Sequence, residues 1–126
     1  MSFKVSYVES RARDILQDNF ANAYRWNTVT LIRLIYDGIQ MAHSVRPESR
    51  YVGLILTALV VPTVADDAAP TAIAGYRDAT VPLDDRWAEA IVHYVAAKCF
   101  EMDSADSANA DRSAYHKAEF ERVINL

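Results

Sequence analysis

Three side chains that commonly bind metal ions recur at helical spacing in one segment. Asp85, Glu89 and His93 are four residues apart, so a helix would place all three on one face. Carboxylate and imidazole groups at this spacing can ligate a divalent metal, and the same pattern also makes ordinary solvated ion pairs. One helix supplies too few ligands for a closed metal site, so the ion-pair interpretation is favoured and no metal is expected.

The remaining reactive side chains do not form a catalytic pattern. Lys98 falls on the apolar face of the same predicted helix and needs a carboxylate partner or a route to water. Its candidate partners are Asp18, Asp103 and Asp106. Cys99 follows His93 by six residues, and the sequence has no nucleophile elbow, phosphate loop, dinucleotide fingerprint or paired C-x-x-C. We therefore predict a protein that is not an enzyme and needs no cofactor.

Composition and charge narrow the class of protein further. The chain has 126 residues, of which 52% are hydrophobic, and this suits one globular domain. A single cysteine indicates a reducing compartment, and no segment is long and apolar enough to predict a membrane helix or a signal peptide. A monomeric module that binds nucleic acid should carry a basic face, whereas the net charge here is −4.

Hydrophobic periodicity predicts a mainly α fold, a four-helix bundle-like domain with a long central excursion. The expected helices cover about residues 3–18, 28–45, 84–102 and 107–123. The second is the most regular and should be the spine on which the others pack, with Thr28 as its N-cap and an end before Pro47. Gly38 lies within its apolar face, which predicts the close approach of another helix. Asp84 is the expected N-cap of the third helix.

The central excursion, about residues 50–82, is predicted to meet a partner. Residues 60–64 and 72–76 have strand-like composition and flank a turn signal at residues 66–70, so a β-hairpin is one expected structure. The excursion holds more apolar residues than a loop needs, and the last helix has apolar residues on more than one side. The predicted partner interface comprises Leu54, Leu56, Leu59, Val61, Ile73, Tyr76, Phe120, Ile124 and Leu126.

Short motifs give the chain a resemblance to a known family. Leu16-Gln17-Asp18 ends the first helix, Arg25-Trp26 precedes the second, and Arg46-Pro47 closes it. Further motifs follow the variable middle: Val81-Pro82-Leu83 with Asp84 to Trp87, then Tyr94-Val95, Lys98 and Asp103, then Asn109, Ala110, Tyr115 and Phe120. In this order they resemble the head–tail connector (adaptor) proteins of tailed bacteriophages. Tyr36 and Gly38 depart from the family pattern.

The resemblance implies a structural virion protein rather than an enzyme. Such adaptors form a ring, usually of twelve copies, beneath the portal protein in the virion neck. The ring extends the channel through which DNA passes without sequence-specific binding, and it docks a neck stopper or tail protein. Assembly would take place in the host cytoplasm, with no membrane involved. The alternative function is a small helical enzyme or metal-binding protein that uses Asp85, Glu89 and His93.

Overall fold

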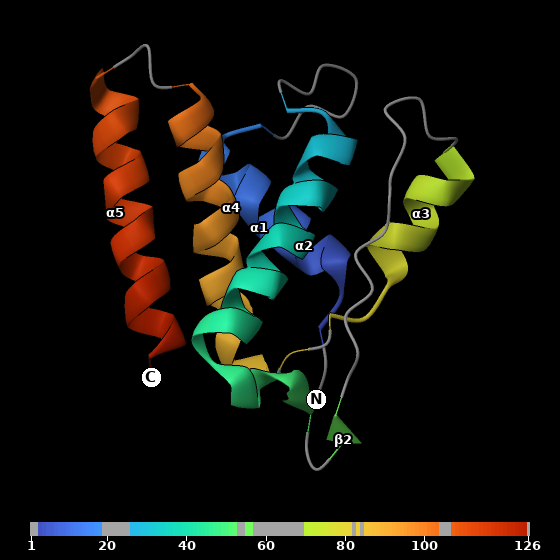
Figure 1. The fold of residues 1–126 in the computed structure, drawn as a ribbon. Coiled ribbons are helices and arrows are strands. Elements are labelled where there is room, and N and C mark those ends of the chain that lie inside the picture. The colour runs from blue at the N-terminus through green and yellow to red at the C-terminus, as the bar shows by residue number, and fades with distance from the viewer. Residues whose placement is uncertain are drawn as a thin grey trace.

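The computed structural model describes residues 3–18, 26–52, 55–56, 70–81, 83, 85–103 and 107–125, and these residues are mainly helical. The helices are α1 (Val5–Leu16), α2 (Thr28–Val45), α3 (Pro70–Asp78), α4 (Ala88–Met102) and α5 (Ser107–Ile124). Short 3-10 turns, η1 (Pro47–Arg50) and η2 (Asp85–Trp87), follow α2 and precede α4. Figure 1 shows α2, α4 and α5 side by side, with α1 behind them and α3 on the far side of α2.

Helix α4, rather than α2, is the centre of the fold. It packs against α5, α2 and α1, and its contact with α5 is the most extensive between any two of the described elements. Ile91, Val92 and Val95 are fully buried, and so are small residues such as Ala90 and Ala96. A helix with apolar residues on several sides is contacted on several sides, whereas the apolar residues of the amphipathic α2 form one face. The prediction that α2 is the spine was therefore wrong.

The helix boundaries agree with the predicted ones within a few residues, and the N-cap of α2 differs by one position. Asn27 is the N-cap, because its side chain accepts a hydrogen bond of 2.8 Å from the Val29 amide. The Thr28 hydroxyl instead accepts hydrogen bonds from Arg13 and Arg77. Asp84 lies outside the described residues.

The middle of the chain corrects the predicted hairpin. Residues 72–76 belong to helix α3, not to a strand, while residues 60–64 lie outside the described part of the chain. Pro70 suits the first position of a helix, and Ile73 and Tyr76 are one turn apart and pack against the core. The contact of Ile73 and Tyr76 with the core favours a helix over residues 72–76, although their composition is strand-like. A minimal antiparallel pair, β1 (Tyr51–Val52) with β2 (Ile55–Leu56), lies earlier in the sequence.

Candidate partner-binding surface

Glu89 and His93, two of the three residues predicted to share one face of a helix, have separate partners. Glu89 accepts a hydrogen bond of 3.0 Å from the Tyr7 hydroxyl and pairs with Arg11 at 3.3 Å. His93 turns away toward α5, and the Asp85 side chain lies outside the described part of the structure. Within the described ranges, no three His, Cys, Asp or Glu side chains are grouped as metal ligands would be. The Glu89 carboxylate instead joins α4 to α1 through its contacts with Tyr7 and Arg11.

His93 meets a histidine that the sequence spacing did not connect to it. Its Nδ1 lies 2.9 Å from Nδ1 of His116 on α5, and the two rings stack with centroids 5.1 Å apart. Burial lowers the pKa of both imidazoles, and the charge of His93 lowers the pKa of His116 further. One Nδ1–H can donate to the other nitrogen only while at least one ring is neutral. The pair is therefore a contact between α4 and α5 that strong acid should open.

Lys98 and Cys99 also have structural surroundings. The Lys98 ammonium lies 3.7 Å from Glu101 and 5.6 Å from the centre of the Tyr94 ring. Its carboxylate partner is therefore Glu101, which was not among the predicted aspartates, and Asp106 lies outside the described residues. Cys99 is fully buried, and burial raises the pKa of its thiol to about 12. A thiol with this pKa is not a nucleophile at neutral pH.

A buried polar cluster joins α1, α2 and α3. Glu9 accepts hydrogen bonds from Arg13 at 3.0 Å and from Arg77 at 2.8 Å, and Arg13 also donates to Asp18 at 2.8 Å. Glu9, Arg13 and Asp18 are almost completely buried, so the paired charges compensate one another. Glu9 and Arg13 are four residues apart, and this helical spacing was the feature of the sequence that indicated an ion pair here. The role of the cluster is to hold α3 against α1.

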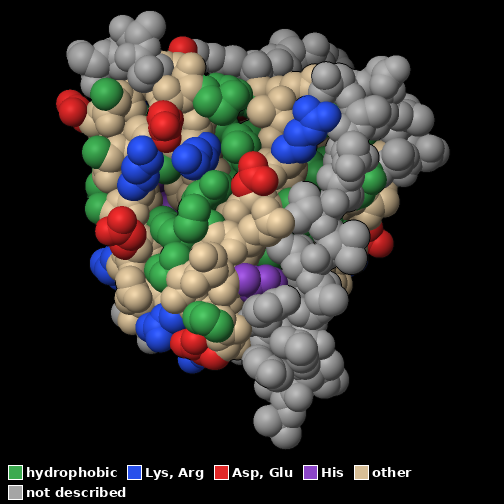
Figure 2. Space-filling model, viewed as in Figure 1, with side chains coloured by type: hydrophobic (Ala, Val, Ile, Leu, Met, Phe, Trp, Pro, Cys, Tyr) green, Lys and Arg blue, Asp and Glu red, His purple; other side chains and the backbone are tan. Residues whose placement is uncertain are grey.

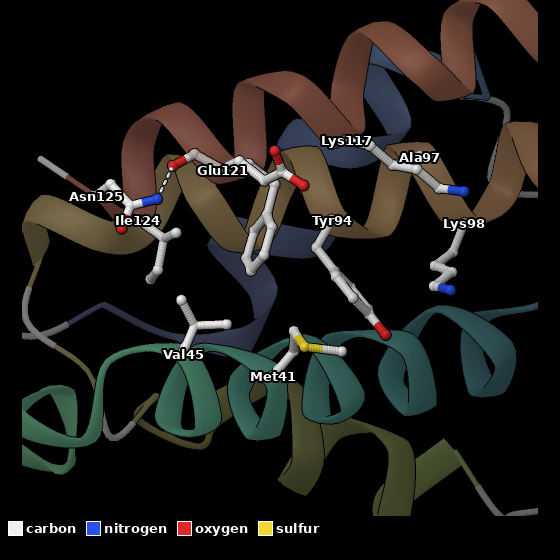
Figure 3. A pocket seen from close by; sticks show the side chains of 10 residues that line it. Met41, Val45, Tyr94, Ala97, Lys98, Lys117, Glu121, Ile124 and Asn125 are labelled. Atoms are coloured by element: carbon white, nitrogen blue, oxygen red, sulfur yellow. Dashed lines mark hydrogen bonds between the residues drawn. The ribbon is translucent and has the colours of Figure 1, made fainter.

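The feature best suited to binding a partner is a groove between α2 and α5 with α4 as its floor. We call it the α2–α5 groove; its volume is about 270 Å³. Met41 and Val45 of α2 line one side, and they are 42% and 45% exposed. Figure 2 shows hydrophobic side chains gathered on this face between charged ones. The lining is Met41, Val45, Tyr94, Ala97, Lys98, Lys117, Phe120, Glu121, Ile124 and Asn125 (Figure 3).

Gly38 shapes this groove by admitting the Tyr94 ring. A Cβ atom at Gly38 would lie 2.9 Å from Cδ1 of Tyr94, closer than ordinary packing permits. The Tyr94 ring in turn meets Phe120 edge to face, with centroids 5.6 Å apart. The predicted close approach at Gly38 is confirmed, and its consequence is a groove wall made of two aromatic rings.

Both ends of the groove carry cations, but Arg46 at the Val45 end pairs with a carboxylate of its own, Glu48, at 3.0 Å, whereas the two lysines at the opposite end share one. At one end Lys98 and Lys117, from different helices, lie 3.7 and 3.1 Å from the same Glu101 carboxylate. At the other end, near Val45, the Arg46 side chain donates to the Ile124 carbonyl at 2.8 Å and so satisfies an orphan group of α5. Two ammonium groups share one carboxylate, so the lysine end can accept a second acid.

The predicted interface residues fall into three groups. Phe120 and Ile124 are buried in the chain's own core, so they form the base of the groove rather than a free patch. Ile73 and Tyr76 are half-buried on α3 and pack against the core. The side chain of Leu56 and the residues Leu54, Leu59, Val61 and Leu126 lie outside the described part. Met41 and Val45 were not predicted, although two apolar residues four apart beside the main stripe were a usable signal.

Comparisons with protein-family models, with curated proteins and with solved structures give no match for this chain. Among the described helices, none combines the length and the hydrophobicity that crossing a membrane requires.

Proposed function

We propose that this chain is a structural virion protein of the head–tail connector (adaptor) type. In this proposal, copies with a four-helix bundle-like body form a ring of about twelve beneath the portal protein. The ring would extend the DNA channel and dock a neck stopper or tail protein. The motif resemblance suggests the family, and the exposed α2–α5 groove is the observation that carries the assembly role.

The groove supports assembly because apolar surface of this kind is most stable when covered. Met41 and Val45 expose their side chains beside a concave aromatic wall, which suits insertion of an apolar segment. We assign a second copy of the chain as the occupant. A contact in which one surface receives a different surface of the next copy is head-to-tail, and such contacts generate rings when the rotation closes.

The electrostatics support a channel that does not grip DNA. The net charge of −4 disfavours tight binding of phosphates, as a passage for moving DNA requires. The side chains considered for chemistry, Glu89, His93 and Lys98, instead join helices or lie in surface ion pairs.

The test is the mass of the protein in solution, alone and mixed with portal and neck proteins of a tailed phage. We expect a ring-sized species in at least one mixture. Met41→Glu should weaken assembly because it places a charge in the groove. Met102→Glu is the matched control, since Met102 is 61% exposed and does not line the groove. A chain that stays monomeric in every mixture would refute the proposal, and equal assembly of the two variants would refute the role of the groove.

A further inference from the structure

We propose that residues 59–67 of one copy bind in the α2–α5 groove of the neighbouring copy. This inference rests on the proposed ring and names the segment that makes its subunit contact. It begins from the chemistry of the groove: an apolar trough followed by two lysines that share one carboxylate. A matching ligand is an apolar stretch of chain followed at a short distance by acid.

Two stretches of the sequence are of this kind, and one of them, residues 81–85, has Val81 and Leu83 buried in the chain's own core, which leaves residues 59–67. Leu59-Val60-Val61-Pro62-Thr63-Val64 is apolar except for one threonine, and Asp66-Asp67 follows after a single alanine. Aliphatic side chains would cover Met41 and Val45, and the aspartates would reach the lysine end. Apolar burial supplies the attraction, while the charges set the direction in which the segment lies.

The lengths agree. Lys117 and Asn125 mark the two ends of the groove on α5 and are eight residues apart, which is about 12 Å at 1.5 Å per helical residue. An extended chain rises about 3.3 Å per residue, so four residues cover the same distance. With Pro62 beside Val45, Asp66 would therefore lie beside Lys98 and Lys117.

The placement of the chain's own elements favours a neighbouring copy as the donor. The segment continues into α3, which packs on α1 and α2, whereas the groove lies between α2 and α5. Figure 1 shows α3 and α5 on opposite sides of α2. To fill its own groove, the segment would have to cross α2 and return within the residues between Leu56 and Pro70. The neighbouring copy's groove carries no such constraint, and the resulting contact is head-to-tail.

A peptide titration tests the recognition without requiring a ring. A synthetic peptide of residues 57–69 is added to the isotope-labelled full chain, and amide chemical shifts are followed by NMR. We expect saturable shifts at Met41, Val45 and Lys117. A peptide with Asp66→Asn and Asp67→Asn should bind two- to five-fold more weakly for each exposed ion pair lost. Lys98→Gln with Lys117→Gln should weaken the parent peptide and leave the amide peptide unchanged. No saturable shift at millimolar peptide, or shifts at another surface, would overturn the inference.

Mixed single-cysteine chains test whether the contact joins two copies. One population carries Val45→Cys, the other carries Pro62→Cys, and they are mixed under the conditions that give the ring-sized species. The native Cys99 is fully buried and should not interfere. We expect a cross-linked dimer in the mixture and none when Met102→Cys replaces Val45→Cys. A cross-link formed only within a chain that carries both substitutions would overturn the inference.

The two experiments separate this inference from the proposed function. A ring that forms without peptide binding or the Val45–Pro62 cross-link would retain the adaptor role and remove this segment from the contact. Peptide binding by a chain that never forms a ring with any partner would refute the adaptor role, and with it the neighbouring copy as donor.

Discussion

Replacing Gly38 by alanine is the most direct test of the packing that forms the groove. Alanine is favoured over glycine in a helix interior by about 1 kcal/mol. At Gly38 the added Cβ would lie 2.9 Å from Cδ1 and 3.3 Å from Cγ of Tyr94, so the ring must move. Overpacking of this kind costs about 1–3 kcal/mol. We expect Gly38→Ala to be destabilised by about 1 kcal/mol after the helix gain is included.

Gly75 provides a matched control in the same chain. It lies in α3, and a Cβ there would meet no atom within 4 Å. Gly75→Ala should therefore show the helix gain alone, about 0.5–1 kcal/mol of added stability. At about 2.1 cal/mol/K of unfolding entropy per residue, 1 kcal/mol corresponds to about 4 °C in Tm for a chain of this length. Gly38→Ala should therefore have a lower Tm than the parent and Gly75→Ala a higher one, with about 6–8 °C between the two variants.

A double-mutant cycle identifies the cause of the difference. In a Tyr94→Ala background the ring is absent, so Gly38→Ala should become neutral or stabilising. Urea or thermal unfolding followed by circular dichroism measures the four variants and the parent. The reasoning is refuted if Gly38→Ala raises Tm as much as Gly75→Ala does, or if the effect of Gly38→Ala is the same with and without Tyr94.

Three further predictions concern the buried polar groups. Burial alone would raise the pKa of Glu9, but hydrogen bonds from Arg77 and Arg13 outweigh it and lower the pKa. The stabilisation is therefore present above about pH 4.5 and is lost in stronger acid. In urea unfolding, Glu9→Gln should lower the free energy of unfolding by about 3 kcal/mol at pH 7 and reduce its decline in acid. The pKa of His93 and of His116 is lowered in the folded chain, so the unfolded chain binds more protons below about pH 6.5 and the free energy of unfolding should fall between pH 7 and 5. His116→Phe should make this decrease with falling pH smaller in unfolding curves measured at fixed salt. An unchanged pH dependence would contradict the role of the pair. Cys99 should react with a thiol reagent only at the rate of unfolding, and rapid labelling of the native chain would show that it is not buried.

Local signals predicted the helices well because each carries its own periodicity and end signals. The α2 helix begins at Thr28 and ends at Val45 as the apolar repeat and Pro47 indicated. The strand prediction for residues 72–76 failed because propensity there opposed packing. Alanine, isoleucine and tyrosine are compatible with either structure, and contact with α1 and α2 decided between them.

The candidate site depended on contacts between distant residues. Gly38 pointed to a close neighbour, but the sequence could not identify Tyr94 as that neighbour. His93 was grouped with Asp85 and Glu89, yet it meets His116 because α4 and α5 pack along their length. Glu9 is almost completely buried, and its partner Arg77 lies 68 residues away in the sequence, beyond the reach of helical spacing.

The sequence by itself determined the helical class, the positions of the four long helices and the tight contact at Gly38, since these follow from spacing along one chain. The tertiary structure alone decided that α4 is central, that Phe120 and Ile124 are buried, and that Met41 and Val45 remain exposed beside them. Periodicity shows which face of a helix is apolar, but it does not show which other helix will pack against that face. That pairing depends on the free energy of the whole packed chain.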